Sequence, residues 1–143
     1  MVQKLEHKLV TVRSRSRFLQ TVRGPTESHM TVHSSHGRAI AIACDVTDEA
    51  QVTAAVDQAK EAFGGIDILI NGATLFNTKG VLNMPLVEWR RQTDVMLTGA
   101  FLFTKHTAKQ MIELGRWGNM INIISTAGHQ GEPGNIGYGT SKG

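Results

Sequence analysis

The stretch Arg38-Ala39-Ile40-Ala41-Ile42-Ala43-Cys44 decides the fold class of this chain. It is a nearly continuous apolar run, which predicts a strand buried on both faces of a parallel sheet. Residues 45–49 then lead into a helix with acidic residues in its first turn, and Thr47 is the expected N-cap. The apolar residues of this helix recur at helical spacing until Gly64-Gly65 ends it, and they are Val52, Ala55, Val56, Ala59 and Phe63.

The same alternation of strand and helix continues along the chain. Residues 66–71 predict a second buried strand, and residues 119–124 predict a third. Between them, residues 88–112 predict a helix in two pieces, with Val95, Phe101, Leu102 and Met111 among its apolar positions. This order is typical of βαβ units, so we expect an α/β fold: a Rossmann-type parallel sheet with flanking helices.

Length and composition narrow the class of protein further. The chain has 143 residues, 41% of them hydrophobic and 19% charged, which is usual for one globular domain. Cys44 is the only cysteine, so the sequence contains neither a disulfide framework nor a cysteine metal cluster. No apolar run approaches the ~20 residues that a membrane span needs. We therefore expect a cytoplasmic protein without a membrane partner.

The N-terminal part reads differently from the rest. Residues 7–12 predict a strand, but residues 13–36 show no sustained period, and only residues 30–32 look strand-like. We expect two regions: an irregular basic segment at 1–36 and a partial Rossmann-type oxidoreductase domain at 37–143. Our hypothesis is that residues 13–36 arose from a frameshift with deletion or from a misjoined gene.

The composition of this segment suggests three other functions: a nucleic-acid-binding arm, a transit peptide and a metal site. Residues 1–38 hold seven Lys or Arg against two Glu, which could indicate a nucleic-acid-binding arm. Phe18 is the only aromatic residue there, so stacking on bases is not supported. A transit peptide should begin the chain rather than follow a strand. His29, His33 and His36 fall at helical offsets, but no acidic residue or cysteine joins this pattern, so no metal site is expected.

Polar residues follow each predicted strand of the regular region. Asp45, Asn71 and Ser125 each come directly at or after a strand end. Ligands of open α/β sheets bind at the carboxyl ends of the strands. The sequence therefore predicts a ligand site at this edge of the sheet.

The last residues contain the spacing Tyr138-Gly139-Thr140-Ser141-Lys142. Positions four apart share one face of a helix, which would place a phenol beside an ammonium. A neighbouring cation favours the phenolate form of tyrosine, which can exchange a proton with an oxygen of an alcohol or a carbonyl. On this spacing alone, an exposed helical pair without function is the other interpretation.

Together these residues resemble the short-chain dehydrogenase/reductase family, from about Gly37 to Gly143 and more weakly at residues 8–12. Ser125 and Tyr138 have the family's usual separation, and Lys142 follows at the expected place. The resemblance implies that Tyr138 is the general acid/base, that Ser125 orients the substrate oxygen, and that Lys142 favours the phenolate and holds the nicotinamide ribose.

The resemblance also implies a cofactor site. Asp45-Val46 looks like the family's contact to the adenine ring, and residues 71–74 (Asn71-Gly72-Ala73-Thr74) are similar to its Asn-Asn-Ala-Gly turn. The implied cofactor-binding residues are Asp45, Val46, Asn71, Ala73, Tyr138 and Lys142, and the implied cofactor is NAD or NADP. The implied substrate is a small alcohol or carbonyl compound, and a homo-oligomer is the expected assembly.

Several departures from the family pattern bear on activity. Met96 stands where the family has an Asn that supports a proton-relay water, and a thioether cannot replace that hydrogen bond. Arg13-Ser14-Arg15-Ser16 follows the first predicted strand instead of a glycine-rich pyrophosphate loop. The fold is thus expected to be incomplete, without the glycine-rich first turn, the second strand and the last strands.

These departures leave two main functional hypotheses. The first is an NAD(P)-dependent oxidoreductase that uses Tyr138, with little or no turnover in this chain. The second is a catalytically inactive remnant that associates through its long helices. In either case we expect exposed apolar surface and a tendency to associate.

Overall fold

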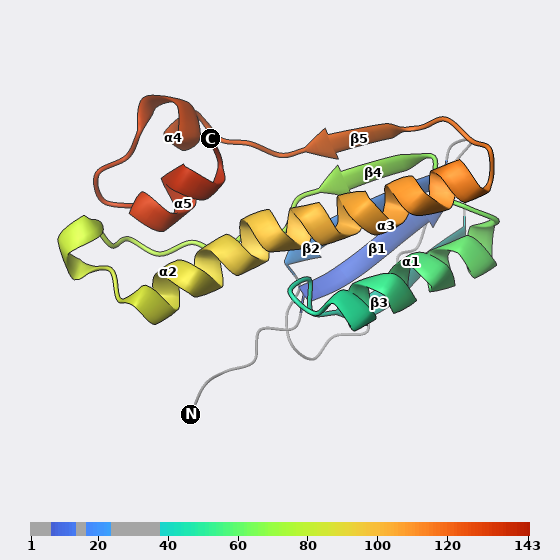
Figure 1. Cartoon of the computed structure of the whole chain (residues 1–143), viewed down its shortest axis with the longest axis horizontal. Helices are drawn as coiled ribbons and strands as arrows, with labels where there is room; N and C mark the ends of the chain where they lie inside the picture. Colours follow the sequence, from blue (N-terminus) through green and yellow to red (C-terminus); the bar gives the residue numbers. More distant parts are fainter. Residues whose placement is uncertain (1–6, 14–16, 24–37) are drawn as a thin grey trace.

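The computed structural model describes residues 7–13, 17–23 and 38–143, which form one five-stranded sheet with helices (Figure 1). The strands are β1 (His7–Arg13), β2 (Arg17–Arg23), β3 (Arg38–Cys44), β4 (Ile68–Asn71) and β5 (Asn119–Asn122). The α-helices are α1 (Glu49–Phe63), α2 (Leu86–Thr93), α3 (Gly99–Glu113), α4 (Thr126–Gln130) and α5 (Ile136–Ser141). The expected Rossmann-type α/β architecture is confirmed.

The order of the strands is β3-β1-β2-β4-β5. β2 and β4 are parallel, as are β4 and β5, whereas β1 is antiparallel to both of its neighbours, β2 and β3. β3 therefore runs in the same direction as β2, and four of the five strands point their carboxyl ends to one edge. This common edge is where an open α/β sheet binds ligands.

The strand β2 corrects one sequence-based interpretation. The expectation that residues 13–36 contain no strand apart from residues 30–32 was wrong, because Arg17–Arg23 pairs with β1 on one side and with β4 on the other. In the Rossmann order the first strand lies beside the fourth, and here β2 has that place rather than residues 8–12. Residues 30–32 and the histidines at 29, 33 and 36 lie outside the described residues.

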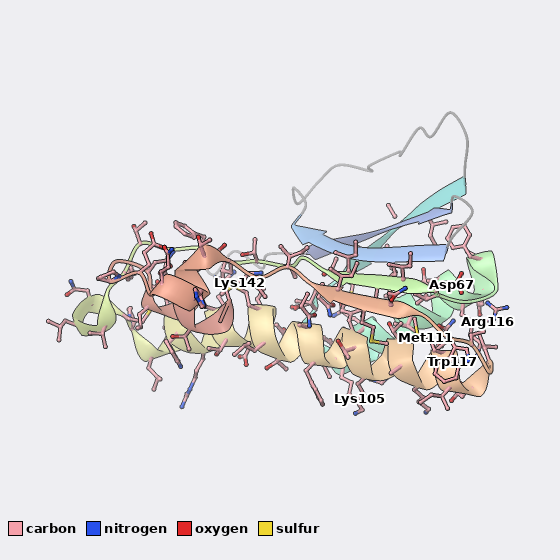
Figure 2. All side chains as sticks on the ribbon, turned by 90° about the horizontal axis from the view of Figure 1, so that it is seen from above. Asp67, Lys105, Met111, Arg116, Trp117 and Lys142 are labelled. Carbon is pink, nitrogen blue, oxygen red and sulfur yellow. The ribbon has the colours of Figure 1, made fainter. Side chains whose placement is uncertain are left out.

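Burial along β3 corrects a second expectation. Ile42 and Cys44 are buried, but the alternating residues Ala41 and Ala43 are exposed, so this strand is not buried on both faces. The physical reason is that α1 and α3 lie on the same side of the sheet, and no described helix covers the other side (Figures 1 and 2). With one face covered, side chains alternate between buried and exposed along the strand.

The opposite edge strand, β5, is also more exposed than the sequence predicts. Ile121, Ile123 and Ile124 of the predicted third strand are 44%, 49% and 71% exposed. Nearby, Trp117 in the connection from α3 to β5 is almost fully exposed. The expectation of exposed apolar surface is thus confirmed, while association of the chain stays a prediction.

Helix α1 has the core face that the sequence predicts, with a different N-cap. Its buried residues are Val52, Ala55, Val56, Ala59 and Phe63, all as predicted. The N-cap is Asp48 rather than Thr47, because the Asp48 carboxylate accepts hydrogen bonds from the N–H groups of Ala50 and Gln51. Thr47 instead donates both its N–H and its hydroxyl to Asp45 Oδ1, at 3.0 and 2.8 Å.

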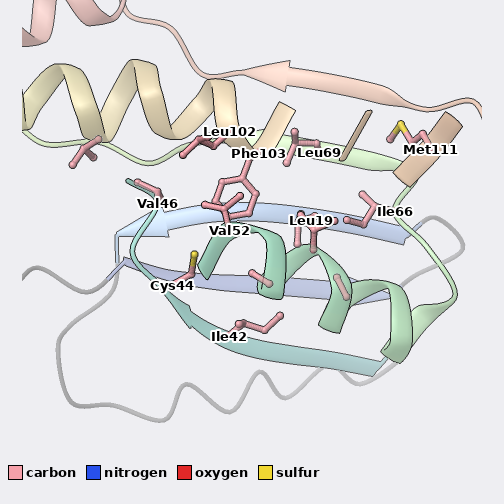
Figure 3. Packing of buried hydrophobic residues seen from close by; sticks show 14 of the residues in the cluster. Leu19, Ile42, Cys44, Val46, Val52, Ile66, Leu69, Leu102, Phe103 and Met111 are labelled. Carbon is pink, nitrogen blue, oxygen red and sulfur yellow. The ribbon is translucent and has the colours of Figure 1, made fainter. Parts of the chain in front are cut away.

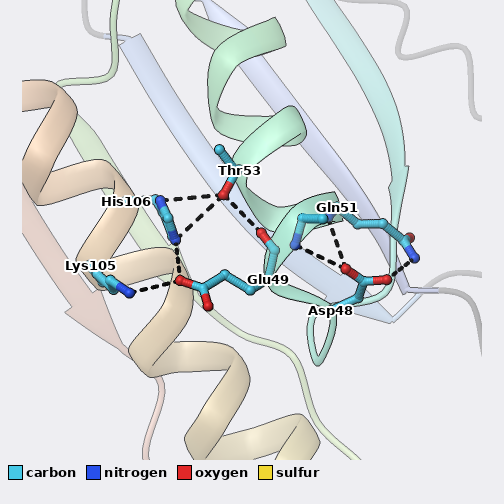
Figure 4. A network of polar contacts seen from close by, with 7 residues as sticks. Asp48, Glu49, Gln51, Thr53, Lys105 and His106 are labelled. Carbon is cyan, nitrogen blue, oxygen red and sulfur yellow. Dashed lines mark hydrogen bonds and ion pairs between the residues drawn. The ribbon is translucent and has the colours of Figure 1, made fainter.

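Polar contacts join α1 to α3 at the surface (Figure 4). Glu49 Oε1 lies 2.7 Å from Lys105 Nζ and 2.9 Å from His106 Nε2. These contacts lower the pKa of Glu49, first through the hydrogen bond from Lys105 and then through that from His106. Such exposed pairs add little to stability.

The long helical segment consists of two α-helices, α2 and α3, as the sequence predicts. Between α2 and α3, residues Asp94–Thr98 form a π-helical turn (η2), so the axis continues while the spacing of side chains changes. Val95 and Leu102 are buried as expected, whereas Phe101 is 61% exposed. π-helical turns occur often at functional sites, and this one contains Met96.

The hydrophobic core lies between the sheet and the two helices α1 and α3 (Figure 3). Its fully buried members include Leu19 of β2, Leu69 of β4 and Phe103 of α3. None of the helices in the described residues is both long and apolar enough to cross a membrane.

Candidate functional site

A cavity of about 180 Å³ lies at the carboxyl ends of β2, β4 and β5. Four of the sequence-predicted site residues line it, namely Val46, Asn71, Ala73 and Lys142. Asp45, Ser125 and Tyr138 are not among its lining residues. The structure therefore brings together the residues predicted to hold the cofactor, apart from Asp45 and Tyr138, while the predicted proton-transfer residues lie to one side.

Thr21 of β2 is a site residue that the sequence reasoning missed. Its hydroxyl donates to the carbonyl oxygen of Ile70 at 3.4 Å and accepts from the N–H groups of Gly72 and Ala73, at 2.9 and 3.2 Å. A single side chain thus fixes the turn that follows β4. No motif could have identified it, because its strand had not been predicted.

Asn71 forms the polar wall of the cavity. Its amide nitrogen donates to Asn122 Oδ1 at 2.9 Å and to Thr104 Oγ1 at 3.1 Å, which ties β4 to β5 and α3. Its carbonyl oxygen, Oδ1, is buried and has no hydrogen-bond partner in the described part of the chain. Buried acceptors without a partner are uncommon in native proteins.

Asp45 lies at the end of β3 and is only partly buried. Its Oδ1 is already bonded to Thr47, and its own N–H donates to Gln51 Oε1 at 2.9 Å. Val46, the next residue, is buried and packs against Gly99 of α3. A Cβ added at Gly99 would come 2.8 Å from Val46 Cγ2. This close approach explains why glycine begins α3.

Lys142 is the most buried ionisable residue of the site, at 8% exposure. Its ammonium donates to the carbonyl oxygen of Ile123 at 2.7 Å. Burial lowers the pKa of this lysine, because the charged form loses hydration. An ammonium has three donors, so two more hydrogen bonds to a ligand are open to Lys142 in chemical terms.

The predicted pairing of Tyr138 with Lys142 stays a prediction, and α5 determines where both residues lie. α5 ends at Ser141, and Lys142 is its C-cap residue, with its N–H bonded to the carbonyl oxygen of Gly139 at 3.2 Å. Tyr138 lies within the helix, and Lys142 lies at its C-terminal end. The phenol ring meets the edge of Phe76, with ring centroids 5.2 Å apart.

Ser125 is the N-cap of α4 and a direct neighbour of Lys142 in space. Its N–H donates to the carbonyl oxygen of Lys142 at 3.4 Å, and its hydroxyl oxygen accepts from Ala127 N–H at 3.2 Å. A serine hydroxyl carries one donor besides its two lone pairs. The cap therefore uses only an acceptor position, and the hydroxyl hydrogen can still serve a substrate oxygen.

Met96 in the π-helical turn is 5% exposed and also lines the cavity. Its sulfur accepts a weak hydrogen bond from the hydroxyl of Thr74 at 3.7 Å. It packs in the core as expected and presents no donor to the cavity. Among the described residues, no group of three or more His, Cys, Asp or Glu could hold a metal ion.

The residues present fit one end of a dinucleotide. Pockets for small ligands measure roughly 300–1,000 Å³, so a cavity of about 180 Å³ holds only part of such a molecule. The unpartnered Asn71 Oδ1 and the Lys142 ammonium match the hydroxyl groups of a ribose in donor and acceptor character. Residues 24–37, which follow β2, lie outside the described residues.

Comparison with known proteins agrees with this geometry. A family model described as short chain dehydrogenase matches residues 9–143. The 3-alpha-(or 20-beta)-hydroxysteroid dehydrogenase of Mycobacterium bovis is 46% identical over 98 residues, covering 68% of this chain and 37% of the relative. Glucose 1-dehydrogenase 2 of Bacillus subtilis is 36% identical over 124 residues, covering 84% and 47%.

Solved structures show the same relationship. NAD+-bound xylitol dehydrogenase superposes with a TM-score of 0.65 at 38% identity, covering 69% of this chain and 38% of that one. A short-chain type dehydrogenase/reductase from Mycobacterium marinum has a TM-score of 0.67 at 37% identity, covering 71% and 42%. The chain spans less than half the length of the relatives named here. It belongs to the short-chain dehydrogenase/reductase family, whose cofactors are NAD and NADP.

Proposed function

We propose that this chain forms part of an NAD(P)-dependent oxidoreductase site that acts on a small alcohol or carbonyl compound. The observation that carries the proposal is the cavity at the carboxyl edge of the sheet, lined by Asn71 and by the buried ammonium of Lys142. When bound, the dinucleotide supplies the hydride donor or acceptor. Lys142 and Asn71 would hold the ribose hydroxyls, and Val46 and Ala73 would contact the rings.

The protein's own part in the reaction is to move a proton. Tyr138 takes the hydroxyl proton of an alcohol as it becomes a carbonyl, and returns a proton in the reverse direction. Ser125 donates its free hydroxyl hydrogen to the same oxygen. These roles require the substrate to lie between the cavity and the two helices α4 and α5. Ser125 is the N-cap of α4 and Tyr138 lies in α5, and neither residue lines the cavity.

The catalytic role of Tyr138 gives a direct test. Tyr138→Phe removes the proton but keeps the ring against Phe76, so cofactor binding should persist while turnover falls by ~10²–10⁴-fold. Turnover is followed by nicotinamide absorbance with a panel of secondary alcohols and NAD+ or NADP+. The same measurable rate in both proteins would contradict the role of Tyr138, whereas no turnover in the parent would favour an inactive remnant.

Cofactor binding is tested separately by titrating the chain with NADH and NADPH and following fluorescence. We expect saturable binding that is lost in Lys142→Ala and retained in Lys109→Ala, whose side chain is 72% exposed. Equal binding in both variants would contradict the proposed ribose contact. We further propose a cytoplasmic location and a homo-oligomer, in line with the family.

A catalytically inactive remnant is the second candidate, and two observations favour it. Ser125 and Tyr138 do not line the cavity, and Met96 offers no hydrogen-bond donor there. If the chain binds no dinucleotide, the remnant is the better account. Sizing at several protein concentrations would then show whether it associates through its long helices.

A further inference from the structure

The side chain of Gln92 in α2 is buried to 1% exposure, although it is polar. Neither its carboxamide oxygen nor its nitrogen has a hydrogen-bond partner in the described part of the chain. Burying an amide without partners lowers stability. Such local conflicts are expected at residues that serve a site rather than the core.

The Gln92 carboxamide lies directly against Gly137 of α5. A Cβ at position 137 would come 1.6 Å from Gln92 Oε1, which no real atom pair tolerates. Residue 137 can therefore be nothing larger than glycine while Gln92 keeps its place. Alanine otherwise forms helix more readily than glycine, so this contact is the obstacle to alanine here.

The contact matters because α5 is held by α2 and its neighbouring loop. The Ile136 N–H donates to the carbonyl oxygen of Lys79 at 3.2 Å, and Lys79 in turn forms an ion pair with Glu88 of α2. Tyr138 follows Gly137 directly in the chain. Any change in the spacing between α2 and α5 thus displaces the phenol.

We propose that Gln92 is a positioning residue for Tyr138: its carboxamide, seated on Gly137, sets the distance of α5 from α2 and so the place of the phenol. The inference rests on the proposed function only in that Tyr138 is taken as the acid/base. The contact itself is independent of cofactor binding.

Tyr138 is the only tyrosine of the chain, so 3-fluorotyrosine labelling gives a single fluorine NMR resonance that reports its surroundings. We expect Gly137→Ala to displace this resonance in the parent protein. In the Gln92→Ala background, the same Gly137→Ala change should displace it little, because the obstructing amide is gone. This non-additivity is the signature of direct coupling between the two residues.

The matched control is Gly134→Ala, in the same segment, where an added Cβ meets nothing within 4 Å. We expect it to leave the resonance in place. Equal displacement by Gly137→Ala in both backgrounds, or none in the parent, overturns the proposal. So does loss of cooperative unfolding in Gln92→Ala alone, which would make Gln92 a residue of the whole fold.

Folding of the variants is also informative. If Gly137→Ala alone does not fold, the double variant should, as judged by a cooperative urea transition. If neither folds, the clash does not involve Gln92 and the proposal is overturned. Failure of the chain to bind a dinucleotide would count against the proposed function but would leave the fluorine result unchanged.

Discussion

The two ends of this molecule differ in the kind of side chain that each of them buries. We call the sheet with α1 and α3 the body. We call residues 72–93 and 125–143, which include α2, α4 and α5, the tip, and it extends beyond the ends of β4 and β5 (Figure 1). Apart from Val95 and Met96 in the π-helical turn between them, the buried hydrophobic residues all lie in the body, and the tip contains none. The buried residues of the tip other than glycine are polar: Gln92, Asn135, Ser141 and Lys142.

Unmet hydrogen bonds show a weaker form of the same contrast. Among the described residues, five of the eight buried side-chain atoms without a partner lie in the tip, on Gln92, Asn135 and Asn77, and the other three lie in the body, on Asn71, Thr107 and Gln110. Regions with few buried apolar contacts open at low free energy, and binding sites are drawn from them. The body therefore supplies most of the stability, while the tip contains Ser125, Tyr138 and Lys142, the residues proposed to act on the substrate or to hold the cofactor.

The largest expected effect tests the body alone. Phe103 is fully buried in α3 between the sheet and α1, whereas Phe101, two residues earlier, is 61% exposed. Phe103→Ala should lower the free energy of unfolding by ~3–5 kcal/mol, because it removes a buried ring and leaves a cavity. Phe101→Ala should change it by no more than about 0.5 kcal/mol.

Urea unfolding of both variants measures this difference. Equal losses in the two would mean that the face of α3 bearing Phe101 is covered in solution, for example by a second copy of the chain. Dependence of the unfolding midpoint on protein concentration would then identify that association.

A second prediction uses the pKa of Cys44 in the body. Burial, followed by the charges of Asp45 and Asp48, raises the pKa of this thiol from 9.0 to about 12. The unfolded chain releases the thiol proton first, so stability is fully present below about pH 9.0 and is lost as the pH rises toward about 12.

The measurement is the urea midpoint from about pH 8 to about pH 10.5 in the parent and in Cys44→Ala. The variant starts lower because it loses core volume, but its stability should fall less steeply with pH. Parallel curves for the two proteins would show that the thiol titrates alike in the folded and unfolded chain.

The body is also where the sequence predicts most of the fold. The apolar spacing of α1 identifies all of its buried residues, since helical periodicity is a local property. Its cap is displaced by one residue because Asp45 engages Thr47, a choice between two neighbouring side chains that spacing cannot decide. The burial of β3 was overestimated, since an apolar run does not reveal whether one face or two are covered.

What the sequence could not predict depends on contacts between distant segments. β2 contains Arg17, Gln20 and Arg23, and it becomes a strand through pairing with β1 and β4. Thr21 was missed for the same reason. In the tip, the spacing of Tyr138 and Lys142 does not reveal that α5 ends before Lys142, whose ammonium is bonded to Ile123.

The smallest expected effect belongs to the tip and has the opposite sign to that of Cys44. Burial lowers the pKa of Lys142 below its ordinary value of 10.5. Below that lowered pKa the folded chain carries the full penalty of a buried ammonium, and the unfolded chain does not. As the pH rises from the lowered value to 10.5, the folded lysine loses its proton first, so its unfavourable contribution to stability fades.

This effect is measured as the difference in urea midpoint between the parent and Lys142→Met as the pH is raised. We expect the difference to move in favour of the parent, whereas for Lys109→Met, with an exposed side chain, it should stay constant. The same trend in both variants would mean that Lys142 is as well hydrated as a surface lysine. The tip would then be open to water at the residue proposed to hold the cofactor, and the contrast between a packed body and a polar, buried tip would no longer hold there.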